Sequence, residues 1–140
     1  MNATNILLPV DGSEYSDKAA DMAADIAKQN GASIVLLHVR KPVPSGLGRP
    51  NADELLDHLT QGAEAVMDIY RKKLNDAGVT FTDLVIGGKV GEVVADVVRV
   101  EKCDLVVIGS KGKTDFEGLL VGSVTHMVLH TVNCPVLVVK

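Results

Sequence analysis

Glycine, hydroxyl and lysine residues gather between positions 109 and 125. Gly109-Ser110-Lys111-Gly112 is followed, after nine intervening residues, by Gly122-Ser123-Val124-Thr125. Glycines let backbone N–H groups approach an anion closely, and a helix start offers unpaired N–H groups with a partial positive charge. The hydroxyls of Ser123 and Thr125 and the ammonium groups of Lys111 and Lys113 would add donors and charge. This pattern suits the binding of a triphosphate.

Two expected helix starts differ in a way that supports this interpretation. The first helix carries Glu14 and Asp17 in its first turn, whereas the segment Ser123 to Met127 contains no carboxylate. We therefore expect the anion site of the last helix to be free for a ligand. A second interpretation stays open, in which this stretch is a glycine-rich connection with a serine N-cap and solvated lysines.

Motifs of other nucleotide and hydrolase sites are missing from the sequence. Gly112-Lys113-Thr114 resembles the end of a P-loop, but Val107 stands where the first glycine of that motif would be. No G-x-G-x-x-G follows an expected strand, and no G-x-S-x-G occurs. Hydride transfer and serine-dependent ester hydrolysis are therefore disfavoured.

Size and charge narrow the class of protein. The chain has 140 residues, 46% of them hydrophobic, and a formal net charge of −4. One domain over residues 1–140 is expected, and neither the charge nor the four aromatic residues favour binding of nucleic acid. The sequence shows no apolar run long enough for a bilayer and no secretory signal at residues 1–5, so we expect no membrane association and a cytoplasmic location.

Short apolar runs alternate with helical periodicities along the chain. Strands are expected at residues 6–10, 33–39, 79–86, 104–108 and 135–139. Helices are expected up to Asn30-Gly31, from Leu55 to Leu74 before Gly78, around 93–97, and over 123–131. Residues 41–50 contain three prolines and are predicted to form a mobile loop. This order predicts a doubly wound α/β domain with a parallel sheet and four helices on its two faces.

Ligands of such folds bind at the carboxyl ends of the strands. Asp11, Val39 and Gly109 all fall at such ends, so the candidate site is expected beside them.

These residues resemble the universal stress protein family. Its ATP-binding branch carries G-2x-G-9x-G-[S/T], and Gly109, Gly112, Gly122 and Ser123 match this motif without a gap. The resemblance covers the whole chain, through ILLPVDGSE, LLHV, DLVVIGSKGKT, LLVGSVT and CPVLVVK.

The resemblance implies a sheet order of 3-2-1-4-5 and a set of ATP contacts. Pro9, Val10, Asp11 and Val39 match positions that hold adenine and ribose, with backbone groups reading the base. Ile108 and Gly109 to Thr114, which include Ser110, Lys111, Gly112 and Lys113, match the floor and the phosphate turn. Gly122, Ser123, Val124 and Thr125 match the helix start that receives the β and γ phosphates, and Mg²⁺ bridging the phosphates is expected with ATP.

The resemblance also implies a homodimer that pairs the edge strand Pro135 to Val139, which would cover an otherwise open edge. The same order places Cys103 and Cys134 at the starts of neighbouring strands, but no disulfide is proposed.

Several titratable residues leave alternatives open. Asp11 would bond a ribose hydroxyl, help to hold the metal through water, or cap the first helix turn. His126 and His130 are spaced as metal ligands, but without a visible third ligand they are read as surface residues. His38, within a buried strand, is expected to be a hydrogen-bonded structural histidine.

Three functional hypotheses follow. The leading hypothesis is an ATP-binding, stress-response regulator, a homodimeric switch that signals occupancy by ordering the loop at residues 41–50. The second is a slow ATPase or a self-phosphorylating enzyme with Ser123, Ser110 or Thr114 as acceptor, which the motif supports poorly because it places no carboxylate or histidine beside the γ phosphate. The third is a nucleotide-independent dimeric interaction partner, against which the intact glycines argue.

Overall fold

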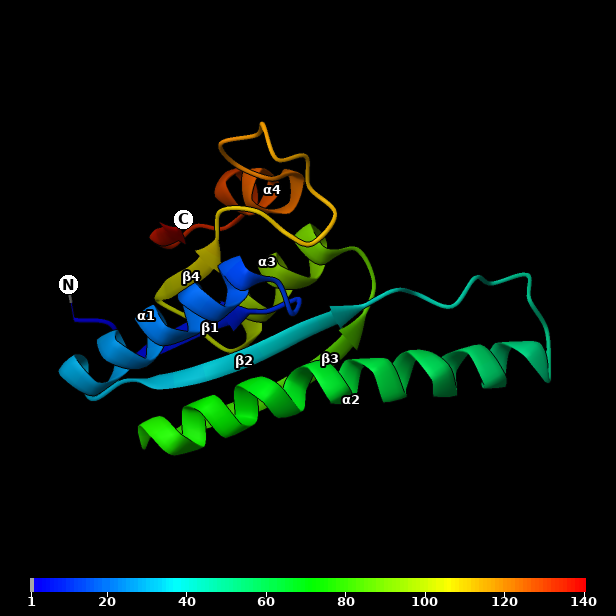
Figure 1. Cartoon of the computed structure of the whole chain (residues 1–140), viewed down its shortest axis with the longest axis horizontal. Coiled ribbons are helices and arrows are strands. Elements are labelled where there is room, and N and C mark those ends of the chain that lie inside the picture. Colours follow the sequence, from blue (N-terminus) through cyan, green and yellow to red (C-terminus); the bar gives the residue numbers. More distant parts are fainter. Residues whose placement is uncertain (1) are drawn as a thin grey trace.

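Five apolar segments form a parallel sheet in this computed structural model, which describes residues 2–140 (Figure 1). The strands are β1 (Asn5–Pro9), β2 (Ser33–Arg40), β3 (Phe81–Gly87), β4 (Leu105–Gly109) and β5 (Val136–Val139). Their order is β3-β2-β1-β4-β5, and every neighbouring pair is parallel. The predicted fold class and the strand order implied by the family resemblance are both confirmed.

Four helices cover the two faces of the sheet. They are α1 (Glu14–Asn30), α2 (Asn51–Ala77), α3 (Val90–Val100) and α4 (Ser123–Thr131). α1 and α2 pack on the face that carries Ile6, Leu8 and Leu36, and α3 and α4 pack on the face that carries Leu7, Val35 and Leu37. Alternate residues of the central strands therefore belong to two separate hydrophobic cores, as the two-residue period of a strand requires.

Helix α1 approaches the sheet through small side chains. Its buried face consists of Ser16 and five alanines, and it ends at Gly31, which has a φ of 65°. Alanine favours the helix and adds little bulk, so the α1 backbone lies close to β4. The positive φ explains the glycine at the end of the helix.

Helix α2 is longer than its apolar periodicity predicts. It begins at Asn51, ahead of the expected Leu55, and ends at Ala77 before Gly78, whose φ is 73°. The Val79 N–H closes this helix end by donating to the Leu74 carbonyl, and β3 therefore begins at Phe81 instead of the predicted Val79. The part of α2 before Ala63 extends beyond the carboxyl edge of the sheet (Figure 1), and its side chains there are exposed or half-buried.

The two outer strands differ from the central ones in burial. β1 and β4 are almost fully buried, whereas all four residues of β5 are half-buried and β3 has two exposed residues. β5 thus lies at one edge of the sheet, where the expected dimer contact would form. No helix within residues 2–140 combines the length and the apolar character needed to cross a bilayer.

Candidate functional site

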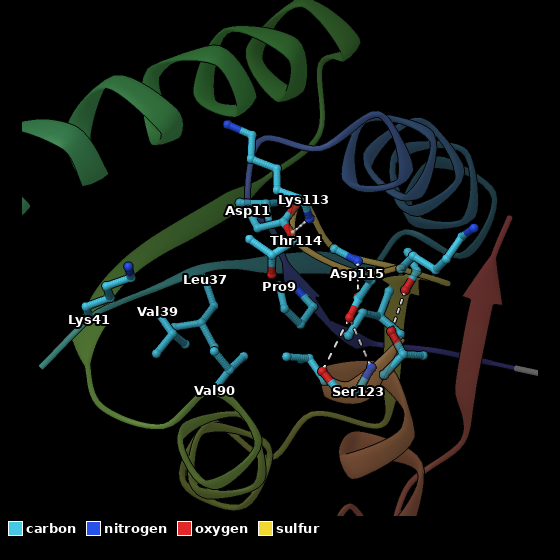
Figure 2. A pocket seen from close by; sticks show the side chains of 17 residues that line it. Pro9, Asp11, Leu37, Val39, Lys41, Val90, Lys113, Thr114, Asp115 and Ser123 are labelled. Atoms are coloured by element: carbon cyan, nitrogen blue, oxygen red, sulfur yellow. Dashed lines mark hydrogen bonds between the residues drawn. The ribbon is translucent and has the colours of Figure 1, made fainter. Parts of the chain in front are cut away.

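A cavity of about 310 Å³ opens at the carboxyl ends of β1, β2 and β4 (Figure 2). The first residues of α3 and α4 and the loop between β4 and α4 complete its wall. Its lining consists of Pro9, Val10, Asp11, Leu37, Val39, Lys41, Val90, Ile108, Gly109, Lys111, Gly112, Lys113, Thr114, Asp115, Ser123, Val124 and Thr125. The cavity lies where the strand order reverses, between β1 and β4, which is the usual ligand position of such folds.

The structure brings the expected site residues together around this cavity. All of them line it except Ser110 and Gly122, and Leu37, Lys41, Val90 and Asp115 join the set. Leu37 and Lys41 stand two residues on either side of Val39 along β2 and the following segment, so the two-residue period of a strand was the signal that could have identified them.

The cavity has an apolar side and a polar side. Leu37, Val39 and Val90 lie together in Figure 2, and Asp115 and Ser123 face each other on the other side. An adenine ring needs flat apolar contact, and phosphate needs N–H and hydroxyl donors. The two sides thus match the two chemical halves of a nucleotide.

Ser110 and Gly122 shape the loop instead of lining the cavity. The Ser110 N–H donates to the Val139 carbonyl at 2.7 Å, which extends the pairing of β4 with β5. The Gly122 N–H donates to the Ser110 carbonyl at 2.6 Å, so this amide is already used within the chain. These bonds fix the two ends of the connecting loop relative to each other.

The Thr125 hydroxyl differs from its expected role as an anion donor. It is buried and donates to the Gly109 carbonyl at 2.7 Å. Because this proton is used to join α4 to the end of β4, the Thr125 side chain positions the wall of the cavity. Ser123, by contrast, is exposed and begins α4 after the N-cap residue Gly122, so the serine is not itself the N-cap.

The three motif glycines are required for three different reasons. A Cβ on Gly109 would lie 2.7 Å from the Tyr15 Cβ and 2.8 Å from the Tyr15 carbonyl carbon, so this glycine lets α1 approach β4. A Cβ on Gly112 would lie 2.8 Å from Asp11 Oδ2, and a Cβ on Gly122 would overlap Asp115 Oδ2. Gly112 and Gly122 thus leave room for the carboxylates of Asp11 and Asp115, whereas Gly109 leaves room for the backbone of α1.

Asp11 organises the turn between β1 and α1. Its Oδ1 accepts from the Ser13 N–H at 2.9 Å and from the Ser16 hydroxyl at 2.7 Å, and its Oδ2 accepts from the Lys113 N–H at 3.1 Å. Burial raises the pKa of this carboxyl, but the hydrogen bonds from Ser13, Ser16 and Lys113 outweigh burial and hold the pKa below its usual value. Asp11 thus has the turn role that the sequence left open, and it also ties the β4–α4 loop to β1.

His38 fixes the backbone at the end of β1. Its Nδ1 lies 2.8 Å from the Val10 carbonyl oxygen, and because a carbonyl only accepts, Nδ1 carries the proton. The Val10 N–H in turn donates to the Leu37 carbonyl at 2.8 Å. The prediction of a hydrogen-bonded structural histidine is confirmed.

The two loop lysines do not place their ammonium groups at the start of α4. Lys111 Nζ donates to the Glu117 carbonyl at 3.0 Å and lies 5.3 Å from the centre of the Tyr15 ring. Figure 2 shows the Lys113 side chain directed away from Ser123. The expected pair of positive charges beside the phosphate position is therefore absent from this conformation within the described residues.

A carboxylate lies at the start of α4, contrary to the expectation of a free anion site. Asp115 Oδ2 accepts from the Gly112 N–H at 2.6 Å, and Oδ1 lies 3.4 Å from both the N–H and the hydroxyl of Ser123 (Figure 2). We call these three donors the α4 cradle. The sequence showed no acidic residue in the first turn of α4, but a residue eight positions before it supplies one.

The remaining polar candidates lie outside the cavity. The rings of His126 and His130 meet edge to face with centroids 4.5 Å apart, and in the part of the chain described here no three His, Cys, Asp or Glu side chains gather as metal ligands. Cys103 and Cys134 are free thiols. Burial, together with the neighbouring Cys134, raises the pKa of the Cys103 thiol to about 12.

Comparison with known proteins decides the family. The family model of the universal stress proteins matches residues 2–140. The chain belongs to the universal stress protein family. The universal stress protein MJ0531 of Methanocaldococcus jannaschii is 35% identical over 138 residues, which cover 96% of this chain and 81% of that relative.

Solved structures of other universal stress proteins share this fold. The structure of MJ0577 from Methanocaldococcus jannaschii has a TM-score of 0.90 at 31% identity and is matched over 100% of this chain and 97% of its own. A universal stress protein solved in complex with cAMP has a TM-score of 0.75 at 23% identity, over 100% of this chain and 98% of its own. The comparison with the cAMP complex shows that the two proteins share this fold.

Proposed function

We propose that this universal stress protein binds ATP in the cavity at the carboxyl edge of its sheet and acts as a homodimeric, nucleotide-dependent switch. One observation carries the proposal, namely a cavity whose apolar side and donor-lined side match the two halves of a nucleotide. The complex of a structural neighbour with cAMP supports an adenine nucleotide as the ligand. A cytoplasmic location and a role in the stress response are parts of the same proposal.

The adenosine part would lie along the ends of β1 and β2. Pro9, Val10 and Asp11 would contact the base and ribose from one strand, and Val39 from the other. The bond from His38 holds the Val10 carbonyl in place, so the backbone that reads the base is already ordered. Asp11 keeps the ribose role assigned to it, since its Oδ2 accepts from a single donor.

The phosphates would lie along the β4–α4 loop and the start of α4. Ile108 and Gly109 form the floor, the turn through Lys111, Gly112, Lys113 and Thr114 runs beside it, and Ser123, Val124 and Thr125 close the end. Ser110 and Gly122 act through the loop closure described above. The first N–H groups and the dipole of α4 favour negative charge at this place.

The residues present suit a Mg²⁺ ion bound together with the phosphates. Mg²⁺ prefers oxygen ligands, keeps several waters and is bound by one or two carboxylates with substrate phosphates. Asp11 borders the cavity, and its Oδ2 would hold the ion through water in the alternative arrangement in which it does not bond the ribose. When bound, the ion would neutralise phosphate charge.

The loop at residues 41–50 is the proposed reporter of occupancy. It contains no helix or strand, and its first residue, Lys41, lines the cavity. A bound nucleotide that contacts Lys41 would restrict this loop, so amide hydrogen exchange over residues 41–50 should slow with saturating ATP and Mg²⁺. Equal exchange rates with and without ATP would remove the reporter role.

Native mass spectrometry before and after addition of ATP with Mg²⁺ tests binding and assembly together. We expect a dimer that pairs residues 135–139 across its two-fold axis and carries one ATP per subunit. A dimer that ignores ATP would favour the nucleotide-independent interaction partner. Release of inorganic phosphate from the same samples would favour the slow ATPase if it disappears in Gly122→Val.

Gly122→Val and Gly118→Val form a matched pair for the site itself. A side chain on Gly122 would take the space at the start of α4 that Asp115 Oδ2 fills and that a phosphate would need, whereas a Cβ on Gly118 meets the edge of the exposed Phe116 ring. We expect Gly122→Val to weaken ATP binding at least about 100-fold and Gly118→Val to leave it unchanged. Circular dichroism of both variants checks that each is folded, and unchanged affinity in Gly122→Val would contradict the site.

A further inference from the structure

Asp115 fills the place where a ligand anion would be held. Its carboxylate faces all three donors of the α4 cradle, at 2.6 Å from the Gly112 nitrogen and 3.4 Å from both the Ser123 nitrogen and hydroxyl. The space is also taken, because a Cβ on Gly122 would overlap Asp115 Oδ2. A phosphate group at this place would need the same donors and the same volume.

The Asp115 carboxylate and a phosphate group are both negatively charged, so they cannot occupy the α4 cradle together. Two anions at contact distance repel strongly where a low-dielectric wall limits screening by water. No ion pair within residues 2–140 includes Asp115, and the Lys111 ammonium on the same loop donates to the Glu117 carbonyl instead. Asp115 therefore has backbone and hydroxyl donors as partners and no cation to neutralise it.

The segment that carries Asp115 has few attachments of its own. Between Gly112 and Gly122 the backbone–backbone bonds are Asp115 N–H to the Gly112 carbonyl at 3.4 Å and Leu119 N–H to the Phe116 carbonyl at 3.0 Å. Two bonds with side chains add to them, from the Lys113 N–H to Asp11 Oδ2 and from Lys111 Nζ to the Glu117 carbonyl. The side chains of Phe116 and Leu120 are 75% and 72% exposed. A segment with so little burial can rearrange without disturbing the two cores.

We propose that Asp115 is an internal competitor for the phosphate groups of the nucleotide. It satisfies the α4 cradle in the free protein and must leave, with its loop, before phosphate binds there. This inference rests on the proposed function, and it assigns to Asp115 a control over phosphate affinity that does not extend to the adenosine part.

The test compares Asp115→Asn with Glu117→Gln. Both variants remove one negative charge from the same loop, but the Glu117 side chain is exposed and outside the cradle. We expect Asp115→Asn to tighten binding of ATP about tenfold, in calorimetry with and without Mg²⁺, and to leave adenosine binding unchanged. Glu117→Gln should change ATP affinity less than about twofold, and Asp115→Ala should reproduce the gain of Asp115→Asn.

Inorganic tripolyphosphate serves as a second probe that does not depend on nucleotide recognition. The amide signals of Gly112 and Ser123 in NMR spectra report its binding, and tripolyphosphate should bind Asp115→Asn about tenfold more tightly than the unaltered protein. If Asp115→Asn binds tripolyphosphate more tightly but neither it nor the unaltered protein binds ATP, the proposed function fails and the role of Asp115 stands.

Three results would overturn the inference. Equal gains in ATP affinity for Asp115→Asn and Glu117→Gln would mean that the loss of one negative charge, and not the position of Asp115, causes the effect. Weaker binding of ATP by Asp115→Asn only when Mg²⁺ is present would make Asp115 part of the metal environment. Unchanged affinity of Asp115→Asn for both ATP and tripolyphosphate would show that the carboxylate does not compete, while ATP binding by the unaltered protein would leave the proposed function intact.

Discussion

Helices α1 and α4 begin at the same edge of the sheet but satisfy their first N–H groups in different ways. At α1 the Ser13 side chain accepts from the Ser16 N–H at 3.2 Å, and Glu14 and Asp17 lie in the first turn. At α4 the N-cap is Gly122, the first turn has no acidic residue, and Asp115 reaches in from the preceding loop.

This difference separates a structural helix start from one suited to a ligand. The partners of α1 are neighbours in sequence, so they are in place whenever the helix is folded. The anion at α4 belongs to an exposed loop, so it can leave while the helix remains intact. We therefore expect changes at α1 to alter stability and changes at α4 to alter binding.

Gly109→Ala should have the largest effect on stability. The added Cβ would lie 2.7 Å from the Tyr15 Cβ and 2.8 Å from its carbonyl carbon, so the first turn of α1 would have to shift away from β4. We expect a loss of about 3 kcal/mol in the free energy of unfolding, measured by urea denaturation. Gly62→Ala is the control, because a Cβ there meets nothing within 4 Å, and a gain of about 1 kcal/mol is expected in the helix. A loss below about 1 kcal/mol for Gly109→Ala would mean that α1 adjusts easily.

Ser13→Ala and Ser123→Ala compare the two helix starts directly. Ser13 is buried and caps α1, whereas the exposed Ser123 hydroxyl lies 3.4 Å from Asp115. Loss of the cap should lower the free energy of unfolding by about 1 kcal/mol, and Ser123→Ala should change it by less than about 0.5 kcal/mol. Thermal and urea unfolding measure both values. Equal losses would contradict the division between the two starts.

Asp11→Asn should change the dependence of stability on acid. The folded pKa of Asp11 lies below the value of 3.8 that it has when unfolded, so the unfolded chain binds the proton first as pH falls. The stabilisation by this carboxylate is complete above the unfolded pKa and is lost as pH falls through the folded pKa. Urea denaturation from pH 6 down to about pH 2 should show a shallower decline for Asp11→Asn. If the free energy of unfolding of Asp11→Asn fell with pH as steeply as that of the unaltered protein, other carboxylates would be responsible for the loss of stability in acid.

Asp115→Asn should have the smallest effect on stability, although it has a large expected effect on binding. Its carboxylate sits at a helix start, where a charge contributes only a few tenths of a kcal/mol at an exposed position. We expect a change of less than about 0.5 kcal/mol in urea denaturation. If the loss matched that of Ser13→Ala, Asp115 would be a cap and the start of α4 would be structural after all.

The sequence predicted best those features that depend only on the periodicity of apolar residues and on where the strands end. Apolar runs located all five strands to within two residues of their observed starts, and the carboxyl ends of parallel strands necessarily share one edge. Residues as distant as Asp11 and Gly112 could therefore be assigned to one site. Family resemblance supplied the strand order, which periodicity cannot determine.

The details of the loop before α4 could not be predicted. A nine-residue connection has many backbone paths, and only the folded path shows that Asp115 turns back onto Gly112 and Ser123. The same holds for the Thr125 hydroxyl, whose acceptor is a carbonyl on another element. Val90 could not be found from glycines or hydroxyls, because it is an apolar residue that reaches the cavity only through the position of α3 after β3 at the same edge.

The part of α2 before Ala63 projects beyond the sheet as a helical arm (Figure 1). The helix is held in the core by Ala63, Met67, Tyr70 and Leu74, and the part before Ala63 stands outside it. At 1.5 Å per residue, residues 51–62 form an arm of about 18 Å. The segment from Lys41 at the cavity to Asn51 at the tip of the arm joins the two. A rotation of the anchored turns by about 10° would therefore move the tip by about 3 Å.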